Sequence, residues 1–562
     1  MNFLVYALGA LTIYCTAFSA YMLYTDKAIR KRMIKFVILF AEILIIAAVC
    51  FINRTFVREV NWERLLVLTC LLIMYCTFSS FYVLESSRKL RRRFFRFLGL
   101  LFGVSIIPVV MVSCFLSTAK EDLGYYLILL SGLAIYCTLF TTYMFDMNKK
   151  LRKNFLRAVL LLVEAAAAPL VILLGYIVPK KRDLVLLMGR FQSGFRDNLK
   201  YLLIYLKDHQ IDKKYDIYYM GHREEKIGEL KDCEIQCANF PSMKTYWLLL
   251  RAGLIITDNT HWGTRNRCNI SLRTPKVQLW HGIGFKPIIL TNKQFVKNIS
   301  GIKGFIKYRL QGVTPTYSTF ISTSEYFSRE FFEASFRPKE IVNLGYPRND
   351  VFLERMSFSQ ELSDINVDVP VVEKIKKLHL EGAKIILWAP TFRSSKVFEL
   401  DPQKVDLQAM SDFGEKHNIY FVFKLHPLPK CAIDFSQYSH IIKCNNHSDI
   451  YPAFCIIDML ITDYSSICLD YLLLDRPMAF FMYDYEDYQT KYRGLNKEAE
   501  DLMPGDICYD QETLEEVIHR NLVEGVDPYA DERKRVRDLS WQYQDGSSCE
   551  RVWNYIENKY LK

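Results

Sequence analysis

The sequence predicts an α/β protein with two parallel-sheet domains, preceded by an all-α membrane region. Three observations lead to this prediction. Residues 1–182 contain a threefold repeat of apolar segments, and from residue 183 short apolar runs alternate with amphipathic segments. Histidine, serine and threonine residues directly follow several of these short runs. Because open α/β sheets bind ligands beyond the carboxyl ends of their strands, the third observation also predicts where the functional site lies.

The repeat is marked by Tyr-Cys-Thr, which begins at Tyr14, Tyr75 and Tyr136 with a spacing of 61 residues both times. A fixed period with matched chemistry indicates internal duplication. Each repeat consists of an apolar segment, a basic loop and a second apolar segment. The six apolar segments are 2–24, 36–53, 65–84, 97–119, 123–145 and 158–179. Most reach the length of about 20 residues that a bilayer core requires. A soluble helical bundle is the alternative, but such long uncharged runs are rare in soluble cores. We therefore expect a membrane domain of three helical hairpins.

The positive charge of the chain belongs to this region. Residues 1–182 hold 23 Lys and Arg against 9 Asp and Glu, a net of +14, whereas the whole chain carries +11. The remainder is thus slightly acidic, with a net of −3. Nucleic-acid binding would require a basic soluble domain, so we expect no nucleic-acid partner. Basic residues beside apolar helices instead predict contact with anionic membrane lipids.

The topology of the six segments presents a conflict. The basic loops 27–35, 88–96 and 149–157 should face the cytoplasm. Six complete spans would then place the rest of the chain on the opposite side, although its expected substrate is cytosolic. The last segment is the weakest span, because its first half holds Glu164, four alanines and Pro169. Either it lies in the interface or re-enters, or all the hairpins are shallow. In each case we expect a multi-pass or monotopic protein with its catalytic part on the cytoplasmic side.

The fifteen cysteines are scattered and form no CxxC pair. This usage is typical of reduced thiols in a cytosolic or membrane setting, without a disulfide framework or a structural zinc. The first apolar run lacks a basic start, so no cleavable signal peptide is expected.

The pattern of residues 183–562 predicts parallel sheets covered by helices. The strand candidates are 184–188, 217–220, 253–257, 277–280, 319–322, 385–388, 420–425 and 459–462. The segments 196–208, 326–335 and 370–380 have amphipathic helical periodicity. A polar, irregular stretch near 350–370 separates two groups of strands. We therefore expect domains at 1–182, 183–355 and 356–562.

His281 directly follows the 277–280 strand and precedes Gly282, Gly284 and Lys286. A neutral imidazole at a strand end is a candidate general base, because it titrates near neutral pH. The glycines allow close approach of backbone to a ligand, and the lysine supplies positive charge. A structural histidine is the alternative reading, and the flanking residues favour function.

A second histidine, His426, ends the 420–425 strand and is held in an extended conformation by Pro427. Ser465 and Ser466 follow the 459–462 strand and precede an apolar helix. Two hydroxyls at a helix N-terminus suit a phosphate, although an ordinary N-cap accounts for one serine. Asp470 lies one turn further, on the same face as Ser466.

Two other turns are candidates for the same cleft. Gly345-Tyr346-Pro347-Arg348 is a rigid turn that carries an arginine, whose planar fork suits a diphosphate. Thr391 follows the 385–388 strand. The sequence contains no Walker A, GxGxxG, HExxH or GxSxG motif. The acidic stretch 483–487 is interpreted as a solvated loop rather than a metal site.

Several of these motifs together resemble the CDP-glycerol glycerophosphotransferases, the bacterial enzymes that prime and polymerise teichoic acids and some capsules. The resemblance covers about residues 190–555 in order and does not include the N-terminal repeat. It rests on Trp280-His281-Gly282, Gly345-Tyr346-Pro347-Arg348-Asn349-Asp350, Lys424-Leu425-His426-Pro427, Ile461-Thr462-Asp463-Tyr464-Ser465-Ser466 with Asp470, Arg476-Pro477, Arg493-Gly494 and Pro504-Gly505.

The resemblance implies a GT-B fold of two Rossmann-like domains, with the acceptor near the first and the CDP-polyol donor in the second. It implies transfer of glycerol phosphate from CDP-glycerol to a lipid-linked acceptor of the undecaprenyl-diphosphate type, with release of CMP and without metal or cofactor. His281 would deprotonate the acceptor, and His426 would stabilise charge at the diphosphate. The implied substrate-binding residues are Gly282, Ile283, Gly284, Phe285, Arg348, Thr391, Lys424, Ser465, Ser466 and Asp470.

One departure from the family leaves the donor open. Ile283-Gly284-Phe285 stands where the family often has Thr-Pro-Leu. A CDP-ribitol enzyme shares most of the motifs, and a GT-B glycosyltransferase that uses a nucleotide sugar is a further alternative. The third alternative is a non-enzymatic carrier of a lipid-linked polymer. The presence of both histidines argues against this alternative. The sequence does not distinguish single addition from polymerisation, teichoic acid from capsule, or one oligomeric state from another.

Overall fold

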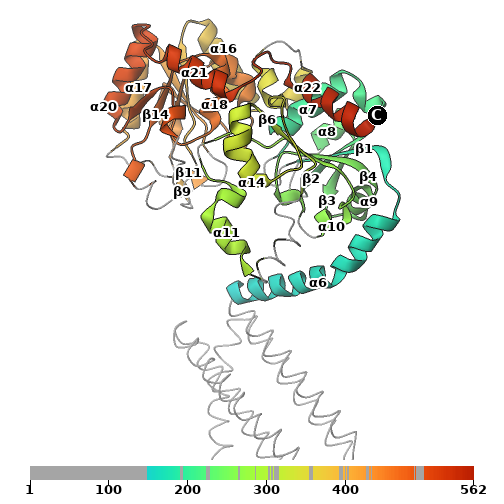
Figure 1. The fold of residues 1–562 in the computed structure, drawn as a ribbon. Coiled ribbons are helices and arrows are strands. Elements are labelled where there is room, and N and C mark those ends of the chain that lie inside the picture. Colours follow the sequence, from blue (N-terminus) through green and yellow to red (C-terminus); the bar gives the residue numbers. More distant parts are fainter. Residues whose placement is uncertain are drawn as a thin grey trace, which may run out of the picture. The chain divides into compact units, whose positions relative to one another are not determined.

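The computed structural model in Figure 1 describes residues 149–562. It leaves out 190–193, 223–227, 264–265, 285, 302–303, 305–307, 309–315, 354–357, 392–396, 399, 401–403, 426–429, 432, 487 and 489–498. The predicted repeats therefore lie outside the described residues, except for the last apolar segment. Residues Arg157–Lys562 form one structural unit.

The first sheet contains seven parallel strands in the order β3-β2-β1-β4-β5-β6-β7. Its strands are β1 Lys181–Met188, β2 Asp216–His222, β3 Cys237–Phe240, β4 Ala252–Thr257, β5 Lys276–Gln278, β6 Thr319–Ser322 and β7 Ile341–Asn343. The first six follow the Rossmann order, in which the direction of winding reverses between β1 and β4. That reversal marks the edge where such a sheet binds ligands.

The second sheet repeats this plan with six parallel strands in the order β12-β10-β8-β13-β14-β15. Its strands are β8 Lys384–Trp388, β10 Ile419–Phe423, β12 Ile441–Lys443, β13 Met459–Thr462, β14 Met478–Phe481 and β15 Asp506–Cys508. The winding reverses between β8 and β13. A separate two-stranded sheet pairs β9 Val397–Phe398 with β11 Lys430–Cys431.

Helices cover both sheets (Figure 1), which explains why the strands are almost continuously apolar. They are α6 Lys149–Ile177, α7 Asp197–Asp208, α8 Gly228–Asp232, α9 Met243–Arg251, α10 Arg267–Ile270, α11 Lys293–Ile299, α13 Glu325–Phe327, α14 Ala334–Phe336, α15 Gln360–Asp364, α16 Val369–Leu380, α17 Leu407–His417, α18 Ile467–Tyr471, α20 Gln511–Ile518, α21 Ala530–Ser540 and α22 Ser548–Ile556. One apolar core continues from Trp280 and Phe320 on the first sheet to Leu387 and Leu460 on the second. The two halves are therefore packed together.

The final helix returns to the first sheet. Cys549, Val552, Trp553 and Ile556 of α22 belong to the same core as Val185 of β1. The predicted domain boundaries at 182/183 and 355/356 stay predictions, and this helix shows that the last residues complete the first half of the molecule.

The predicted α/β class with two Rossmann-like sheets is confirmed. The strands predicted at 319–322 and 459–462 match β6 and β13 residue for residue. The strand predicted at 277–280 is shorter, because β5 ends at Gln278. The predicted all-α membrane domain lies outside the described residues apart from α6.

Candidate active site

His281 lies just beyond the carboxyl end of β5, next to the end of β4. Its Nδ1 is 2.7 Å from the backbone oxygen of Asp258, the residue that follows β4. A carbonyl oxygen can only accept a hydrogen bond, so this contact places the proton on Nδ1 and the lone pair on Nε2. The half-buried imidazole is thus held in the tautomer that a general base needs.

The backbone before His281 is turned by Trp280, whose φ of 56° is uncommon for a bulky residue. The Trp280 N–H donates to Gln278 Oε1 at 2.9 Å, and its carbonyl accepts from Asn198 Nδ2 at 2.9 Å. Its indole is buried against the ring of Phe336, with centroids 4.7 Å apart. Side-chain amides and core packing therefore stabilise a turn that ends β5 early and positions His281.

The loop after His281 reaches the second half of the molecule. A Cβ added at Gly282 would lie 3.2 Å from Ser466 Oγ, and one at Gly284 would lie 3.1 Å from Ser466 Cβ. Gly282 also has a φ of 142°, which side-chain-bearing residues rarely adopt. Ile283, between the two glycines, is 1% exposed and packs in the shared core. The loop is thus anchored by Ile283 and brought against Ser466 by its glycines.

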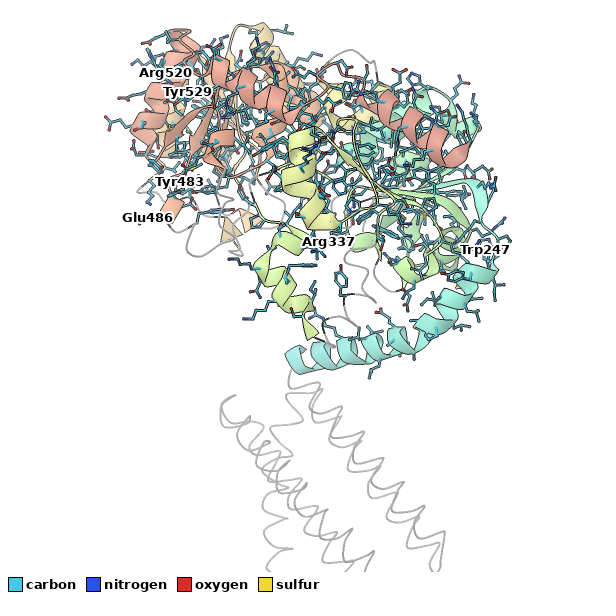
Figure 2. All side chains as sticks on the ribbon, viewed as in Figure 1. Trp247, Arg337, Tyr483, Glu486, Arg520 and Tyr529 are labelled. Atoms are coloured by element: carbon cyan, nitrogen blue, oxygen red, sulfur yellow. The ribbon has the colours of Figure 1, made fainter. Side chains whose placement is uncertain are left out.

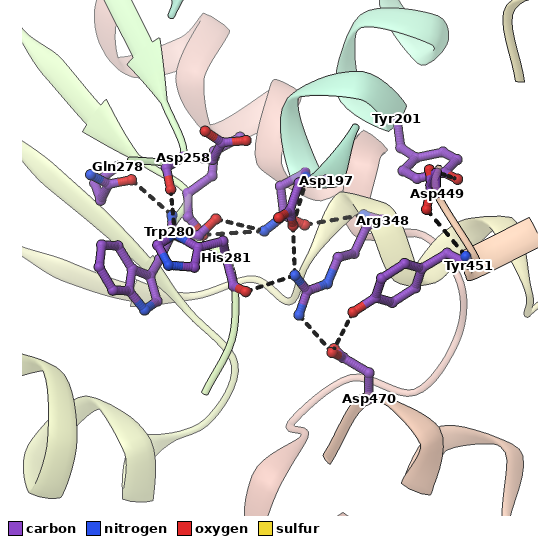
Figure 3. A network of polar contacts seen from close by, with 12 residues as sticks. Asp197, Tyr201, Asp258, Gln278, Trp280, His281, Arg348, Asp449, Tyr451 and Asp470 are labelled. Carbon is purple, nitrogen blue, oxygen red and sulfur yellow. Dashed lines mark hydrogen bonds and ion pairs between the residues drawn. The ribbon is translucent and has the colours of Figure 1, made fainter. Parts of the chain in front are cut away.

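Arg348 connects the two halves behind this loop (Figure 3). Its Nη1 donates to Asp197 Oδ1 at 2.5 Å and to the backbone oxygen of His281 at 2.8 Å. Its Nη2 donates to Asp470 Oδ2 at 2.6 Å, and the Tyr451 hydroxyl donates to the same oxygen at 2.8 Å. One guanidinium thus links α7, the loop after His281 and α18 by charge-assisted hydrogen bonds.

This network is almost closed to solvent, since the side chains of Arg348 and Asp470 are 3% and 2% exposed. Burial raises the pKa of Asp470, although the positive charge of Arg348 opposes this shift. The structure therefore places Arg348 and Asp470 in an ion pair that supports the His281 backbone. Their predicted contacts with substrate phosphate and hydroxyls stay predictions.

The winding reversal of the second sheet carries Thr391 and the Ser465-Ser466 pair. The backbone N–H groups of Thr391 and Tyr464 both donate to Asp463 Oδ1, at 2.7 and 2.5 Å, which ties the ends of β8 and β13 together. Ser465 and Ser466 are half-buried. Ser466 occupies the N-cap position of α18, as predicted, but its hydroxyl makes no capping hydrogen bond. Both serines thus lie where this sheet is expected to bind its ligand.

Two lysines lie near this edge, in different settings. Lys286 brings its Nζ from the His281 loop to 3.5 Å from Thr391 Oγ1 and 5.4 Å from the centroid of the Tyr488 ring. Lys424 instead donates from Nζ to the carbonyls of Asn445 and Asn446, at 2.8 and 2.9 Å. Burial lowers the pKa of Lys424 to about 8. The ammonium of Lys424 holds a turn, whereas that of Lys286 joins the two halves.

The described structure thus brings together His281, Gly282, Gly284, Arg348, Ser466 and Asp470. His426 and Phe285 lie outside the described residues, so their roles stay predictions. Sequence reasoning missed Asp258, although it follows an apolar strand just as His281 does. It also missed Asp197 and Asn198, for which the sequence offers no local signal.

The chemistry of this edge suits a reaction between a hydroxyl and an anionic group. A neutral imidazole can remove a proton, and hydroxyls with a nearby ammonium can position and stabilise negative charge. The loop after β5 contributes the imidazole and the ammonium, and the winding reversal of the second sheet contributes the hydroxyls.

Known proteins resemble this chain in fold and in sequence. A crystallised form of the wall teichoic acid polymerase TagF soaked with CDPG has the same fold, with a TM-score of 0.56 at 22% identity over 74% of this chain and 98% of that one. The teichoic acid ribitol-phosphate polymerase TarK of Staphylococcus aureus is 26% identical over 386 residues, or 66% of this chain and 68% of TarK. The teichoic acid glycerol-phosphate primase of Bacillus subtilis is 29% identical over 320 residues, or 56% of this chain and 76% of the primase.

The family model described as CDP-Glycerol:Poly(glycerophosphate) glycerophosphotransferase matches residues 170–558, which is more than half of the chain. The match covers both sheets and every predicted site residue. The protein therefore belongs to this family of teichoic acid polyol-phosphate transferases, as its motifs predicted.

Proposed function

We propose that the enzyme transfers glycerol phosphate from CDP-glycerol to a hydroxyl of a lipid-linked acceptor at the cytoplasmic face of the membrane, and releases CMP. The observation that carries the proposal is the bond from His281 Nδ1 to the Asp258 carbonyl, because it makes Nε2 the basic nitrogen of the ring, next to a loop that meets Ser466 at Gly282 and Gly284. Family membership supports the reaction class.

In the proposed reaction, His281 Nε2 takes the proton of the acceptor hydroxyl. The acceptor oxygen then forms a bond to the phosphorus of the glycerol phosphate group, and the bond from that phosphorus to the oxygen of CMP breaks. CMP leaves with the electron pair of that bond. Phosphoryl transfer of this kind depends chiefly on positioning and charge stabilisation.

The negative charge that develops would be stabilised from both halves. Ser465 and Ser466 offer hydroxyls at the carboxyl edge of the second sheet, and Lys286 offers an ammonium near Thr391. His426 is assigned to the diphosphate on the resemblance of its motif alone. Arg348 acts in this proposal through the His281 backbone, which its Nη1 holds at 2.8 Å.

The test is CMP release by the full chain in detergent with a lipid-linked acceptor analogue. His281→Ala should reduce turnover by about 10²–10⁴-fold, which is the usual contribution of a general base. His209→Ala is the matched control, because His209 Nδ1 also lies 3.0 Å from a backbone oxygen but the residue is exposed at the C-cap of α7. Near wild-type turnover by a folded His281→Ala protein would refute the assignment.

CDP-ribitol is the second candidate donor, because TarK is a ribitol-phosphate polymerase. The same assay with CDP-glycerol, CDP-ribitol and UDP-sugars separates the candidates. Release with only one CDP-polyol names the donor, whereas turnover of a UDP-sugar alone would replace the proposal by a glycosyltransferase.

A further inference from the structure

Gln278 is the last residue of β5 and lies two positions before Trp280. Side chains fill the interior of the folded unit (Figure 2), and Gln278 is 0% exposed within it. Its Oε1 accepts from the Trp280 N–H at 2.9 Å, and its Nε2 donates to the Asn259 carbonyl at 3.2 Å. An N–H can only donate and a carbonyl can only accept, so these two partners fix the orientation of the amide. A buried amide therefore connects the turn that ends β5 to the turn that follows β4.

The turn after β4 carries the carbonyl that accepts from His281. This carbonyl belongs to Asp258, which stands between Thr257 and Asn259. Asn259 Nδ2 donates to two carbonyls at and just beyond the end of β1, at 3.0 and 3.3 Å. Thr257 Oγ1 donates to one of these carbonyls at 3.0 Å. The Asp258 carbonyl is thus held from both neighbouring residues, and Gln278 supplies a further bond to Asn259.

Gln278 therefore acts on both features that prepare His281 as a base. The direction of the ring depends on the left-handed turn at Trp280, which the bond to Gln278 Oε1 helps to hold. The tautomer depends on the Asp258 carbonyl, which belongs to the turn bound by Gln278 Nε2. Figure 3 shows these residues close together, with the bond from Trp280 to Gln278 and the contact between His281 and Asp258 as dashed lines.

We infer that Gln278 is a positioning residue for the base: its amide holds the backbone that carries His281 and the turn that fixes the tautomer of His281. The inference rests on the proposed function, in which His281 Nε2 takes the proton of the acceptor. It also explains why an amide stands at this position. An ionised carboxylate can only accept, and a thioether donates nothing and accepts weakly, so neither matches both partners.

The first experiment compares the pH dependence of CMP release by the full chain in detergent, with Gln278→Glu and with wild type. The protonated carboxyl can accept from Trp280 and donate to Asn259, whereas the ionised one can only accept. Burial favours the protonated form, which brings both forms within reach of the assay. Burial also raises the pKa of Tyr317 beside Gln278, so this hydroxyl stays protonated.

We expect kcat of Gln278→Glu, relative to wild type, to rise as pH is lowered, with KM for the CDP-polyol unchanged. Thermal unfolding at each pH defines the range in which the variant is folded, and only that range is compared. A relative kcat that is independent of pH, or that falls as pH is lowered, would overturn the inference.

The second experiment removes both bonds with Gln278→Met. We expect kcat to fall by about 10–10²-fold, since a misplacement of about 1 Å can cost 10²-fold. Thr274→Val is the matched control, because Thr274 is 3% exposed and its Oγ1 donates to the Ala252 carbonyl at 3.0 Å, at the opposite ends of β4 and β5. It should lose stability but keep kcat. A wild-type kcat in Gln278→Met, with or without a raised KM, would refute the positioning role.

The third experiment measures the setting of His281 without turnover. Diethyl pyrocarbonate acylates neutral imidazole, and mass spectrometry gives its rate of reaction at His281, which is half-buried in the wild type. Release of the ring in Gln278→Met should increase this rate, whereas Thr274→Val should not. Equal rates in all three proteins would overturn the inference even if His281→Ala is inactive. Faster modification in Gln278→Met together with full activity of His281→Ala would instead refute the proposed function.

Discussion

Arg348 holds the His281 loop to both halves of the molecule. Its two terminal nitrogens pair with carboxylates, and Nη1 also donates to the His281 carbonyl. The phosphate contact predicted from its motif stays a prediction. Arg348→Ala would leave Asp197 and Asp470 without their guanidinium partner, at a cost of about 3–5 kcal/mol in the free energy of unfolding. Urea unfolding of the full chain measures this loss.

Arg329→Ala is the control for this variant, because Arg329 forms an exposed pair with Glu325 whose loss should cost less than about 1 kcal/mol. An Arg348→Ala protein of normal stability, with only its KM for the CDP-polyol raised, would show direct phosphate binding instead.

Gly282 is needed for two reasons, its backbone conformation and its close contact with Ser466, and the two can be tested separately. Its φ of 142° strains any other residue, and a Cβ there would press on Ser466 Oγ at 3.2 Å. Gly282→Ala should therefore lower kcat/KM by about tenfold or more, since backbone strain alone costs about 1–3 kcal/mol. Gly382→Ala is the control for strain alone, because its φ is 91° and among the described residues a Cβ meets nothing within 4 Å. Equal kcat/KM losses in both variants would contradict a specific role for the 282–284 loop.

At the residue scale, the sequence identifies side chains that follow strands, because a parallel sheet places these at one edge. That signal predicts His281, Thr391 and Ser466, and the structure brings Gly282 and Ser466 together. The partners that fix the His281 loop could not be predicted in the same way. Asn198 lies more than eighty residues away in the chain, and only folding places its amide against the Trp280 carbonyl.

Among the elements, α22 depends on a carboxylate from a distant turn. Asp350 accepts from the backbone N–H groups of Ser548 and Cys549 at 3.0 and 2.7 Å, which satisfies the start of the helix. Burial raises the pKa of Asp350 from 3.8 to about 6, so the folded state binds a proton more readily than the unfolded state. The unfolding free energy should therefore fall as pH rises through that window.

Asp350→Asn lacks this titration. We expect the difference in unfolding free energy between wild type and variant to shrink as pH rises from the ordinary value of 3.8 to about 6, as measured by urea unfolding at several pH values. Asp545→Asn serves as the opposite case, because the pKa of Asp545 is lowered. Burial alone would raise this pKa, but the hydrogen bond from Arg551 outweighs burial. If the unfolding free energy of the wild type relative to Asp350→Asn grew with pH, the raised pKa of Asp350 would be contradicted.

Among the strands of the two large sheets, the sequence analysis did not predict β3, β7, β12, β14 and β15, which have three or four residues each. Length alone does not explain this, because β6 and β13 also have four residues and were predicted. β5 ends before its apolar run does, because Trp280 adopts a left-handed conformation that core packing stabilises. Long amphipathic helices such as α16 were predictable because their pattern is repeated over several turns.

For the molecule as a whole, Lys200 is a buried link between the halves. Its Nζ on α7 donates to the Ser363 and Ile365 carbonyls and lies 3.2 Å from Asp449 Oδ2 in the second half. Lys200→Met removes the cation from a buried carboxylate and should lower the unfolding free energy by about 3–5 kcal/mol. Thermal unfolding of the full chain tests this. Lys377→Met, at a position 77% exposed, is the control, and an equal loss in both variants would refute the link.

The overall plan of two Rossmann-like sheets could be predicted because alternating strands and helices impose parallel pairing. The contacts that join the two halves could not be predicted in this way. Lys200, Asp449 and Arg348 come from segments whose sequences give no sign that they meet. The orientation of α6 is a similar case. Its composition fits a spanning helix, and only the bonds from Asn266 and Arg273 show that it follows the folded unit.

The return of α22 to the first sheet has a consequence for the order of folding. The core beside β1 needs Val552 and Trp553, which follow Val185 by more than 360 residues in the sequence. All six strands of the second sheet lie between these two parts of one core. The first sheet therefore cannot complete its packing before the second sheet has been synthesised, which couples the folding of the two halves.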